Sequence, residues 1–192
     1  MSHAKAPVAK SSVAEALRHR RSYSSVGSTA PTQRELLPLI EAAGSVADHG
    51  SLHPWRIIAL RGAARTRVGR AIAAASGVEG SAADKLAAKP LRAPLLLAVV
   101  FSPRSSHKVP EWEQEAVASG VAHALSLVLD EAGWGVMWRT GLQARSAAVA
   151  LAHELTPKEQ LLGWLYVGTR PSSKSGRRKP IKAKDYLTTL SR

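Results

Sequence analysis

The stretch from Glu111 to Gly141 constrains the fold more than any other part of the chain, because it holds the longest uninterrupted helical pattern. Pro110 stands just before it, where the start of a helix tolerates proline, and several glutamates give the first turns the negative charge that suits a helix N-terminus. Apolar residues then recur at three- and four-residue steps, at Val117, Val121, Leu125, Val128 and Leu129. Gly133 can end the helix in a left-handed cap. The pattern therefore predicts a long helix with one buried face.

The residues after this cap predict a short strand that ends in hydrogen-bond donors. Residues 135–141 read GVMWRTG, an apolar run that finishes on a positive charge, a hydroxyl and a glycine. Before it, small residues recur along the helix and keep it thin enough for another backbone to approach closely: Ala116, Ala118, Gly120, Ala122 and Ala124. This order predicts a buried scaffold followed by a binding site.

Two capping-box patterns and several apolar runs predict the other elements. Ser12 with Glu15, and Thr32 with Glu35, have the spacing that begins a helix. We expect the second of these helices to run to about Val46, with Pro38 bending or loosening it. Further helices are expected over residues 63–75, 82–89 and 144–155, and strands over 55–61, 94–101 and 161–167. On its own, this order of helices and strands predicts a mixed sheet with helices around it.

The charge distribution leaves two kinds of partner open. The net charge is +13 with a pI of about 10.8, which prompts a nucleic-acid hypothesis. Residues 172–184 hold six Lys or Arg and no acid, but their Ser, Gly and Pro content indicates an irregular tail rather than a helix that reads a groove. We therefore favour a basic surface that attracts anionic cofactors and substrates, and we do not expect nucleic acid to be the main partner.

Several classes of site lack their sequence signatures. The chain has no cysteine, which excludes disulfides and thiolate chemistry. His49 and His53 are four residues apart, but Gly50 and Pro54 argue against a helix between them and no third ligand is evident, so no metal site is expected. Glycine-rich phosphate loops, catalytic triads and paired carboxylates are not legible either. No signal peptide or run long enough to cross a bilayer is evident, so we expect a cytoplasmic protein without a membrane segment.

A cluster of basic and hydroxyl residues ends the first helix, over residues 18–25. Cations at a helix C-terminus suit the negative end of its dipole, so a solvated helix end accounts for this cluster. Alternatively, Arg20 and Arg21 offer planar guanidinium groups for phosphate, with Ser22 as a further donor. Both interpretations stay open from these residues alone.

Taken together, five motifs in register resemble the nitroreductase family, flavin-dependent NAD(P)H oxidoreductases, and above all its short bacterial members. The motifs cover roughly residues 12–170. They are Arg20-Arg21-Ser22, His53-Pro54-Trp55-Arg56, the run from Lys108 to Glu115, Trp138-Arg139-Thr140-Gly141, and Leu165-Tyr166-Val167-Gly168-Thr169. We accordingly expect a single nitroreductase-like domain over residues 1–192, with an N-terminal arm (1–11), a core (12–170) and a basic C-terminal tail (171–192).

The resemblance implies an α+β fold with a central, mainly antiparallel sheet surrounded by helices, built as an intertwined homodimer with FMN at the interface. It implies that Arg20, Arg21 and Ser22 meet the FMN phosphate and the polar edge of the ring. Trp138, Arg139 and Thr140 would also lie on the flavin, and His49 and Ser51 would reach it from the partner subunit. Which arginine serves the phosphate and which the ring stays open.

The implied activity is a ping-pong transfer of hydride from NADH or NADPH through FMN to a nitroaromatic, quinone or similar electron-poor acceptor. FMN carries out the redox chemistry, so no acid or base residue is required and no catalytic side chain is predicted. Two alternatives remain open at this stage. One is a basic nucleic-acid-binding protein, and the other is a family member that binds flavin without redox turnover.

Overall fold

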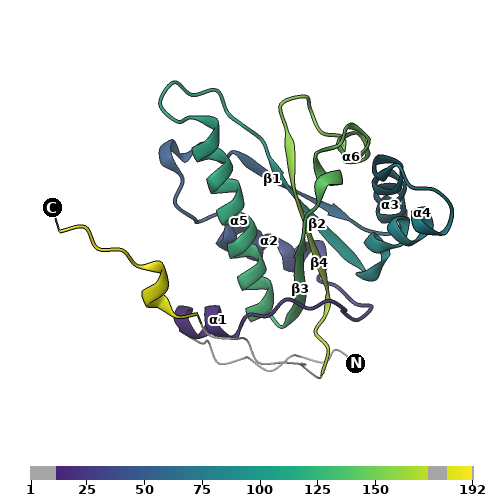
Figure 1. Cartoon of the computed structure of the whole chain (residues 1–192). Helices are drawn as coiled ribbons and strands as arrows, with labels where there is room; N and C mark the ends of the chain where they lie inside the picture. Colours follow the sequence, from purple (N-terminus) through teal and green to yellow (C-terminus); the bar gives the residue numbers. More distant parts are fainter. Residues whose placement is uncertain (1–11, 173–180, 192) are drawn as a thin grey trace.

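Four antiparallel strands form the centre of the fold (Figure 1). The computed structural model describes residues 12–172 and 181–191. The strands are β1 (Trp55–Leu60), β2 (Leu95–Phe101), β3 (Trp134–Arg139) and β4 (Gln160–Thr169), in the order β1-β2-β4-β3. The predicted antiparallel sheet surrounded by helices is confirmed. The mixed sheet expected from element order alone is wrong, because that order does not fix the direction in which each new strand enters the sheet.

Helices cover both faces of this sheet. The helices are α1 (Val13–His19), α2 (Gln33–Ala43), α3 (Ala63–Ser76), α4 (Gly80–Ala87), α5 (Glu111–Glu131) and α6 (Ala147–Ala152), with short 3-10 turns η1 (His49–Ser51), η2 (Lys89–Arg92), η3 (Leu142–Arg145) and η4 (Ala183–Tyr186). Helices α2 and α5 pack on one face, and α3 and α6 pack on the other. Every residue of β2 is buried, because helices lie against both of its faces.

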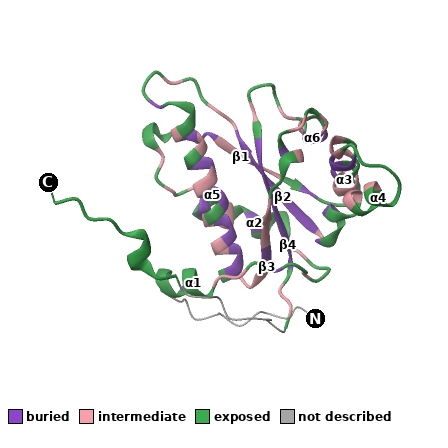
Figure 2. Cartoon of the chain, viewed as in Figure 1, coloured by how far each residue is buried: buried purple, intermediate pink, exposed green. Residues whose placement is uncertain are grey.

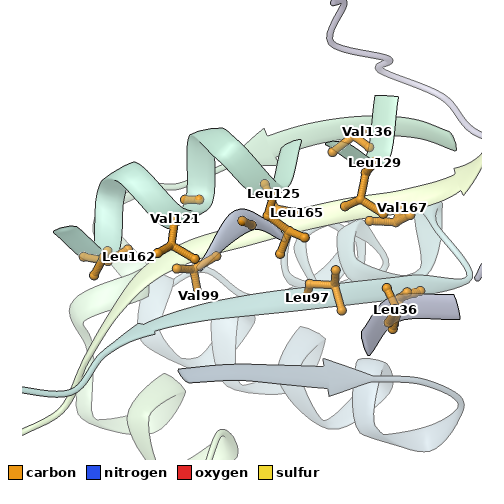
Figure 3. Packing of buried hydrophobic residues seen from close by; sticks show 14 of the residues in the cluster. Leu36, Leu97, Val99, Val121, Leu125, Leu129, Val136, Leu162, Leu165 and Val167 are labelled. Atoms are coloured by element: carbon orange, nitrogen blue, oxygen red, sulfur yellow. The ribbon is translucent and has the colours of Figure 1, made fainter. Parts of the chain in front are cut away.

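The predicted long helix is the main cover of its face. Its apolar stripe packs on alternate residues of the two central strands, and Figure 3 shows Val121, Leu125 and Leu129 above this layer. On the opposite face, Leu96, Ala98 and Val100 join a second core with α3 and α6. The alternation of β2 between the two cores explains why its sequence is apolar at every position.

Most helix boundaries follow from the predicted signals. Both capping boxes form, and the Thr32 hydroxyl accepts a bond from the Glu35 backbone N–H at 3.3 Å. Helix α2 continues through Pro38 but ends at Ala43, earlier than predicted. Gly133 has a φ of 86°, as its predicted role as a left-handed cap requires. The helix predicted over residues 144–155 is divided, because Ser146 is extended and caps α6 anew.

A bulge in β4 brings the end of β3 close to its neighbour. Val99 pairs with Gly163 and Val100 with Leu161, so Leu162 is the extra residue. Gly163 has a φ of 137°, and a Cβ built there would lie 2.5 Å from the Arg139 carbonyl oxygen and 2.7 Å from Trp138 Nε1. A glycine is therefore needed at this point for Trp138 and Arg139 to lie where they do.

A bidentate ion pair ties the start of β1 to the loop before β4. Arg56 Nε and Nη2 donate to the two carboxylate oxygens of Glu159 at 2.6 and 2.9 Å, and the Thr156 N–H adds a third bond at 3.0 Å. The Glu159 side chain is 6% exposed, whereas that of Arg56 is 42% exposed. Chiefly through the hydrogen bonds from Arg56, the pKa of Glu159 is lowered from 4.5 to about 2.

We predict that Glu159→Gln lowers the free energy of unfolding at neutral pH by about 1–2 kcal/mol, a range that allows for solvent screening of Arg56. Because the folded pKa is depressed, the wild-type pair contributes fully above pH 4.5 and loses its contribution as the pH falls toward about 2. Urea titrations at several pH values should show the gap between wild type and variant closing over this range. A gap that stays constant with pH would contradict the ion-pair assignment.

The C-terminal segment differs from the core in exposure. Every residue from 181 to 191 is exposed, and the segment extends away from the sheet (Figures 1 and 2). Its large apolar side chains are between 71% and 86% exposed: Ile181, Tyr186, Leu187 and Leu190. The predicted N-terminal arm and part of the basic tail lie outside the described residues. Over the described part of the chain, no helix has the length and apolar character needed to span a membrane.

Candidate active site

The end of β3 lines a pocket of about 260 Å³ on the α3 side of the sheet. Trp138, Arg139 and Thr140, predicted as one group from the sequence, all contribute to its wall. Its other walls come from β4, η2 and η3, through Trp164, Tyr166, Lys89 and Gln143 among others. Aromatic rings and cationic groups therefore face one cavity, a combination suited to a flat, electron-rich or anionic ligand.

Arg139 is held at this pocket by contacts on two sides. Its guanidinium carbon lies 5.2 Å from the centre of the Tyr166 ring, within the range of a cation–π interaction. Its Nη2 donates to the Ser24 carbonyl at 3.3 Å, while its buried Nε has no hydrogen-bond partner. Burial raises the pKa of the Tyr166 phenol, and the positive charges of Arg139 and Arg92 oppose that shift. These contacts hold the Arg139 side chain in place, and its Nε–H can still donate a hydrogen bond to a ligand.

The pocket carries uncompensated positive charge. None of its lining residues is acidic, and among the described residues neither Arg139 nor Lys89 has an ion-pair partner. The Trp138 indole lies on the α5 side of the sheet instead, edge-to-face on His123 with ring centres 4.9 Å apart. The buried Arg139 Nε is the donor on the pocket side that lacks a partner among the described residues. Buried donors without acceptors are costly, so a ligand that supplies acceptors would be stabilised here.

A buried histidine fixes one of the aromatic rings. Trp164 Nε1 donates to His153 Nε2 at 2.8 Å, and His153 Nδ1 lies 2.7 Å from the Val149 carbonyl. These bonds require a neutral imidazole with its proton on Nδ1. Burial lowers the pKa of His153, which favours that neutral form. His153 therefore anchors Trp164 in the pocket wall, although no sequence motif had singled it out.

The predicted Arg20-Arg21-Ser22 group lies beside the same strand. The next residue, Tyr23, donates its backbone N–H to the Val136 carbonyl at 3.0 Å, so the segment runs along the free edge of β3. Arg20 Nη1 donates to the Ser22 hydroxyl at 3.4 Å. Arg21 Nη1 donates to three carbonyls at the end of α1, and its buried Nε has no partner. Since Arg139 also bonds this segment, the fold brings two predicted groups together.

His49 and Ser51 lie elsewhere in the same chain. His49 Nδ1 is 2.8 Å from a Glu113 carboxylate oxygen, at the first turn of α5. In contrast, α1 packs near the other end of α5 (Figure 1), and a helix of 21 residues spans about 30 Å. One chain therefore keeps His49 and Ser51 apart from the Arg20-Arg21-Ser22 group at the end of α1.

The loop that carries His49 and Ser51 has an unusual backbone. Ser51 and His53 have φ values of 52° and 46°, in the left-handed region that most side chains avoid, and Gly50, just before Ser51, has 77°. The Asp48 carboxylate accepts the His53 backbone N–H at 2.8 Å and helps to hold this shape. Strained conformations of this kind persist where surrounding contacts fix them, and they concentrate at functional sites.

Sequence reasoning missed two residues of the pocket, Lys89 and Tyr166. Lys89 lies in η2, a turn without a recognisable motif. Tyr166 belongs to a motif noted in the sequence, and the alternation of β4 places it on the same side as Trp164. However, its position beside Arg139 depends on the register between β3 and β4, which the sequence does not reveal.

Comparisons with known proteins identify the family of this chain. The model of the nitroreductase family matches residues 17–169. A protein of Escherichia coli K12, provisionally named NAD(P)H nitroreductase YdjA, is 35% identical over 158 residues, covering 81% of this chain and 86% of that protein. A similarly named protein of Haemophilus influenzae is 27% identical over 176 residues, covering 89% of this chain and 95% of its own length.

Solved structures share the fold. A nitroreductase-like family protein from Bacillus cereus superposes with a TM-score of 0.82 at 18% identity, covering 97% of this chain and all of its own. The FMN- and NADPH-dependent nitroreductase NfnB from a Sphigopyxis strain gives a TM-score of 0.73 at 18% identity, covering 94% of this chain and 99% of its own. Family model, relatives and fold agree, and the chain belongs to the nitroreductase family.

Proposed function

We propose that this protein is an FMN-dependent oxidoreductase that uses NADH or NADPH to reduce nitroaromatic, quinone or similar electron-poor acceptors by a ping-pong reaction. The predicted enzyme class and cofactors are those named for its relatives, the NAD(P)H nitroreductases and the FMN- and NADPH-dependent NfnB. The observation that carries the proposal is the aromatic pocket around Arg139, with unpaired donors and no acidic residue.

The residues of this pocket fit FMN. The cofactor presents carbonyl oxygens along one edge of a flat ring system and a phosphate at the end of its side chain, so it needs donors and positive charge. Among the described residues, Arg139 Nε in the pocket and Arg21 Nε in the neighbouring segment are buried donors without partners. Aromatic walls from Trp164 and Tyr166 suit the faces of a flat ring.

The positions of these residues indicate which part of FMN each would bind. Arg139 and Thr140 would hold the ring from the wall that they form with Trp138 and Lys89, and a cation beside the ring would favour the electron-rich reduced state. Arg20, Arg21 and Ser22 would bind the phosphate through charge-assisted bonds. When bound, FMN supplies the chemistry by accepting a hydride from the nicotinamide and passing it to the acceptor. The residues of the chain would bind FMN, orient its ring and tune its reduction potential.

A homodimer would complete this site. His49 and Ser51 lie at the far end of α5 from the Arg20 segment, so the partner's His49 and the partner's Ser51 are the copies that could reach the flavin. The exposed apolar side chains of residues 181–191 offer a second argument, because a stable chain seldom leaves several large ones in water together. We propose that this segment packs on the partner.

Truncation after Ser172 tests the dimer. This cut keeps Thr169, which pairs with Trp134, and Arg170, which contacts the Asp130 carboxylate at 3.3 Å. We expect the folded truncated protein to dissociate at concentrations where the full chain is dimeric, as measured by sedimentation or light scattering. The full-length variant Lys182→Ala/Lys184→Ala is the control for lost charge. A truncated protein as dimeric as wild type would contradict the role of the segment.

The proposed activity is tested by steady-state assay of the purified protein after supplementation with FMN. We expect oxidation of NADH or NADPH that depends on an added nitroaromatic or quinone, with parallel double-reciprocal lines as in a ping-pong reaction. Flavin binding without such turnover would refute the oxidoreductase proposal. A protein that takes up no FMN, yet binds DNA with steep salt dependence, would favour the nucleic-acid alternative.

A further inference from the structure

A second cavity, of about 310 Å³, shares the turn η2 with the candidate active site. Its lining includes Ser28, Arg65, Leu91 and Arg92, and contains no acidic residue. None of the predicted flavin-binding residues lines it. It is therefore a separate cationic cavity that the proposed FMN site does not use.

The two arginines of this second cavity have N–H groups that can donate hydrogen bonds to a ligand. Arg65 Nη1 donates to the Ala93 carbonyl, which fixes the side chain, but its buried Nε has no partner. Among the described residues, neither Arg65 nor Arg92 forms an ion pair with an acid. The Ser28 hydroxyl adds another possible donor, and Leu91, 46% exposed, supplies an apolar surface at the same cavity. Two guanidinium groups with a hydroxyl and no acid suit a phosphate monoester.

The turn η2 connects this cavity to the active-site pocket. Lys89 lines the active-site pocket and Arg92 lines the second cavity. In a 3-10 turn, residues three apart project from the same side and are about 6 Å apart along the axis. The Tyr166 ring, which the Arg139 guanidinium covers, is also close enough to Arg92 for that positive charge to oppose the rise in the pKa of its phenol. A nicotinamide nucleotide that stacks on a flavin in the active-site pocket could therefore extend its adenosine phosphate toward the second cavity.

We infer that the cavity around Arg65 and Arg92 binds the 2′-phosphate of NADPH, so that the enzyme prefers NADPH to NADH. The inference rests on the proposed function, because it assigns the cosubstrate of that same site. In Rossmann-type sites a carboxylate binds the ribose hydroxyls of NAD, whereas an arginine accommodates the 2′-phosphate of NADP, and we apply the same rule of charge to this different fold. The lining of this cavity has two arginines and no carboxylate.

The double variant Arg65→Gln/Arg92→Gln tests this assignment against the matched control Arg34→Gln/Arg70→Gln. The control removes the same two charges from exposed positions on α2 and α3 outside both cavities. We expect the KM for NADPH to rise at least tenfold in the test variant, with little change for NADH. FMN content, and reoxidation by acceptor of enzyme reduced with dithionite, should stay unchanged.

Three results would overturn the assignment. The first is an unchanged KM for NADPH in the test variant. The second is an equal rise of the KM for NADH, which would place another phosphate in the cavity. The third is a loss of bound FMN, which would assign the cavity to the flavin. Calorimetry with adenosine 2′,5′-bisphosphate separates this inference from the proposed function, because that probe lacks the nicotinamide. We expect wild type and control to bind it and the test variant to bind at least tenfold more weakly. Failure of wild type to bind the probe would also refute the inference, whatever the redox activity.

Discussion

Arg139→Ala is expected to yield a folded protein that has lost most of its affinity for FMN. Arg139 lines the active-site pocket, contacts the face of Tyr166 and keeps a buried Nε without a partner. A hydrogen bond from a charged group contributes about 1.5–3 kcal/mol, so one lost contact should weaken FMN binding about 10- to 100-fold. Fluorescence titration of the apoprotein with FMN measures this change.

Arg145→Ala is the matched control for that experiment. Arg145 lies six residues further along the chain, but its guanidinium pairs with the Glu115 carboxylate at 2.7 Å and does not line the pocket. We expect this variant to bind FMN like the wild type. Arg139→Lys should fall between the two, because lysine keeps the charge but loses the planar fork. Equal affinity of Arg139→Ala and wild type would show that Arg139 does not hold the flavin.

Gly163→Ala should have the largest effect on stability, a loss of about 3 kcal/mol. The new Cβ would lie 2.5 Å from the backbone oxygen of Arg139, which cannot move without shifting β3. In addition, the φ of 137° is strained for any residue with a side chain. Overpacking costs about 1–3 kcal/mol and backbone strain about 1–2 kcal/mol. Thermal unfolding should therefore show a Tm about 6–12 °C lower.

Gly77→Ala separates the two contributions to that loss. Gly77 also has a positive φ, of 67°, but a Cβ built there meets nothing within 4 Å. We expect this control to lose only the strain contribution, about 1 kcal/mol. Because Gly163 faces Trp138 and Thr140, its variant should also bind FMN more weakly, whereas Gly77→Ala should not. Similar Tm values for both variants would contradict the close contact between β3 and β4.

Local signals in the sequence were sufficient for most of the fold. The capping boxes at Ser12 and Thr32 and the cap at Gly133 depend on residues a few positions apart, and all three form. The apolar stripe of α5 likewise predicted its buried face. Strand direction depends on contacts between distant residues, which explains why element order alone gave the wrong sheet. The bulge at Leu162 is also set by packing, since it lets Leu162 and Leu165, three residues apart, face the same core.

The candidate site was less accessible to sequence reasoning. The Trp138-Arg139-Thr140 group was predicted because it closes a predicted strand and matches a family motif. Lys89 was missed because it reaches the same pocket from a turn about fifty residues earlier, and only the packing of α3 and α4 places it there. His153 was missed because its role depends on a bond to Trp164 in a different element. The roles assigned to His49 and Ser51 remain predictions that require a second copy of the chain.

The central claim is that this chain holds FMN and passes electrons through it. One measurement tests it most directly, namely the visible absorbance spectrum of the FMN-loaded protein under anaerobic conditions. We predict that NADPH alone bleaches the visible absorbance band of the oxidised flavin, and that a quinone or nitroaromatic added afterwards restores it. A flavin band that NADPH and NADH both leave unchanged, or a protein that acquires no flavin band, would contradict the claim.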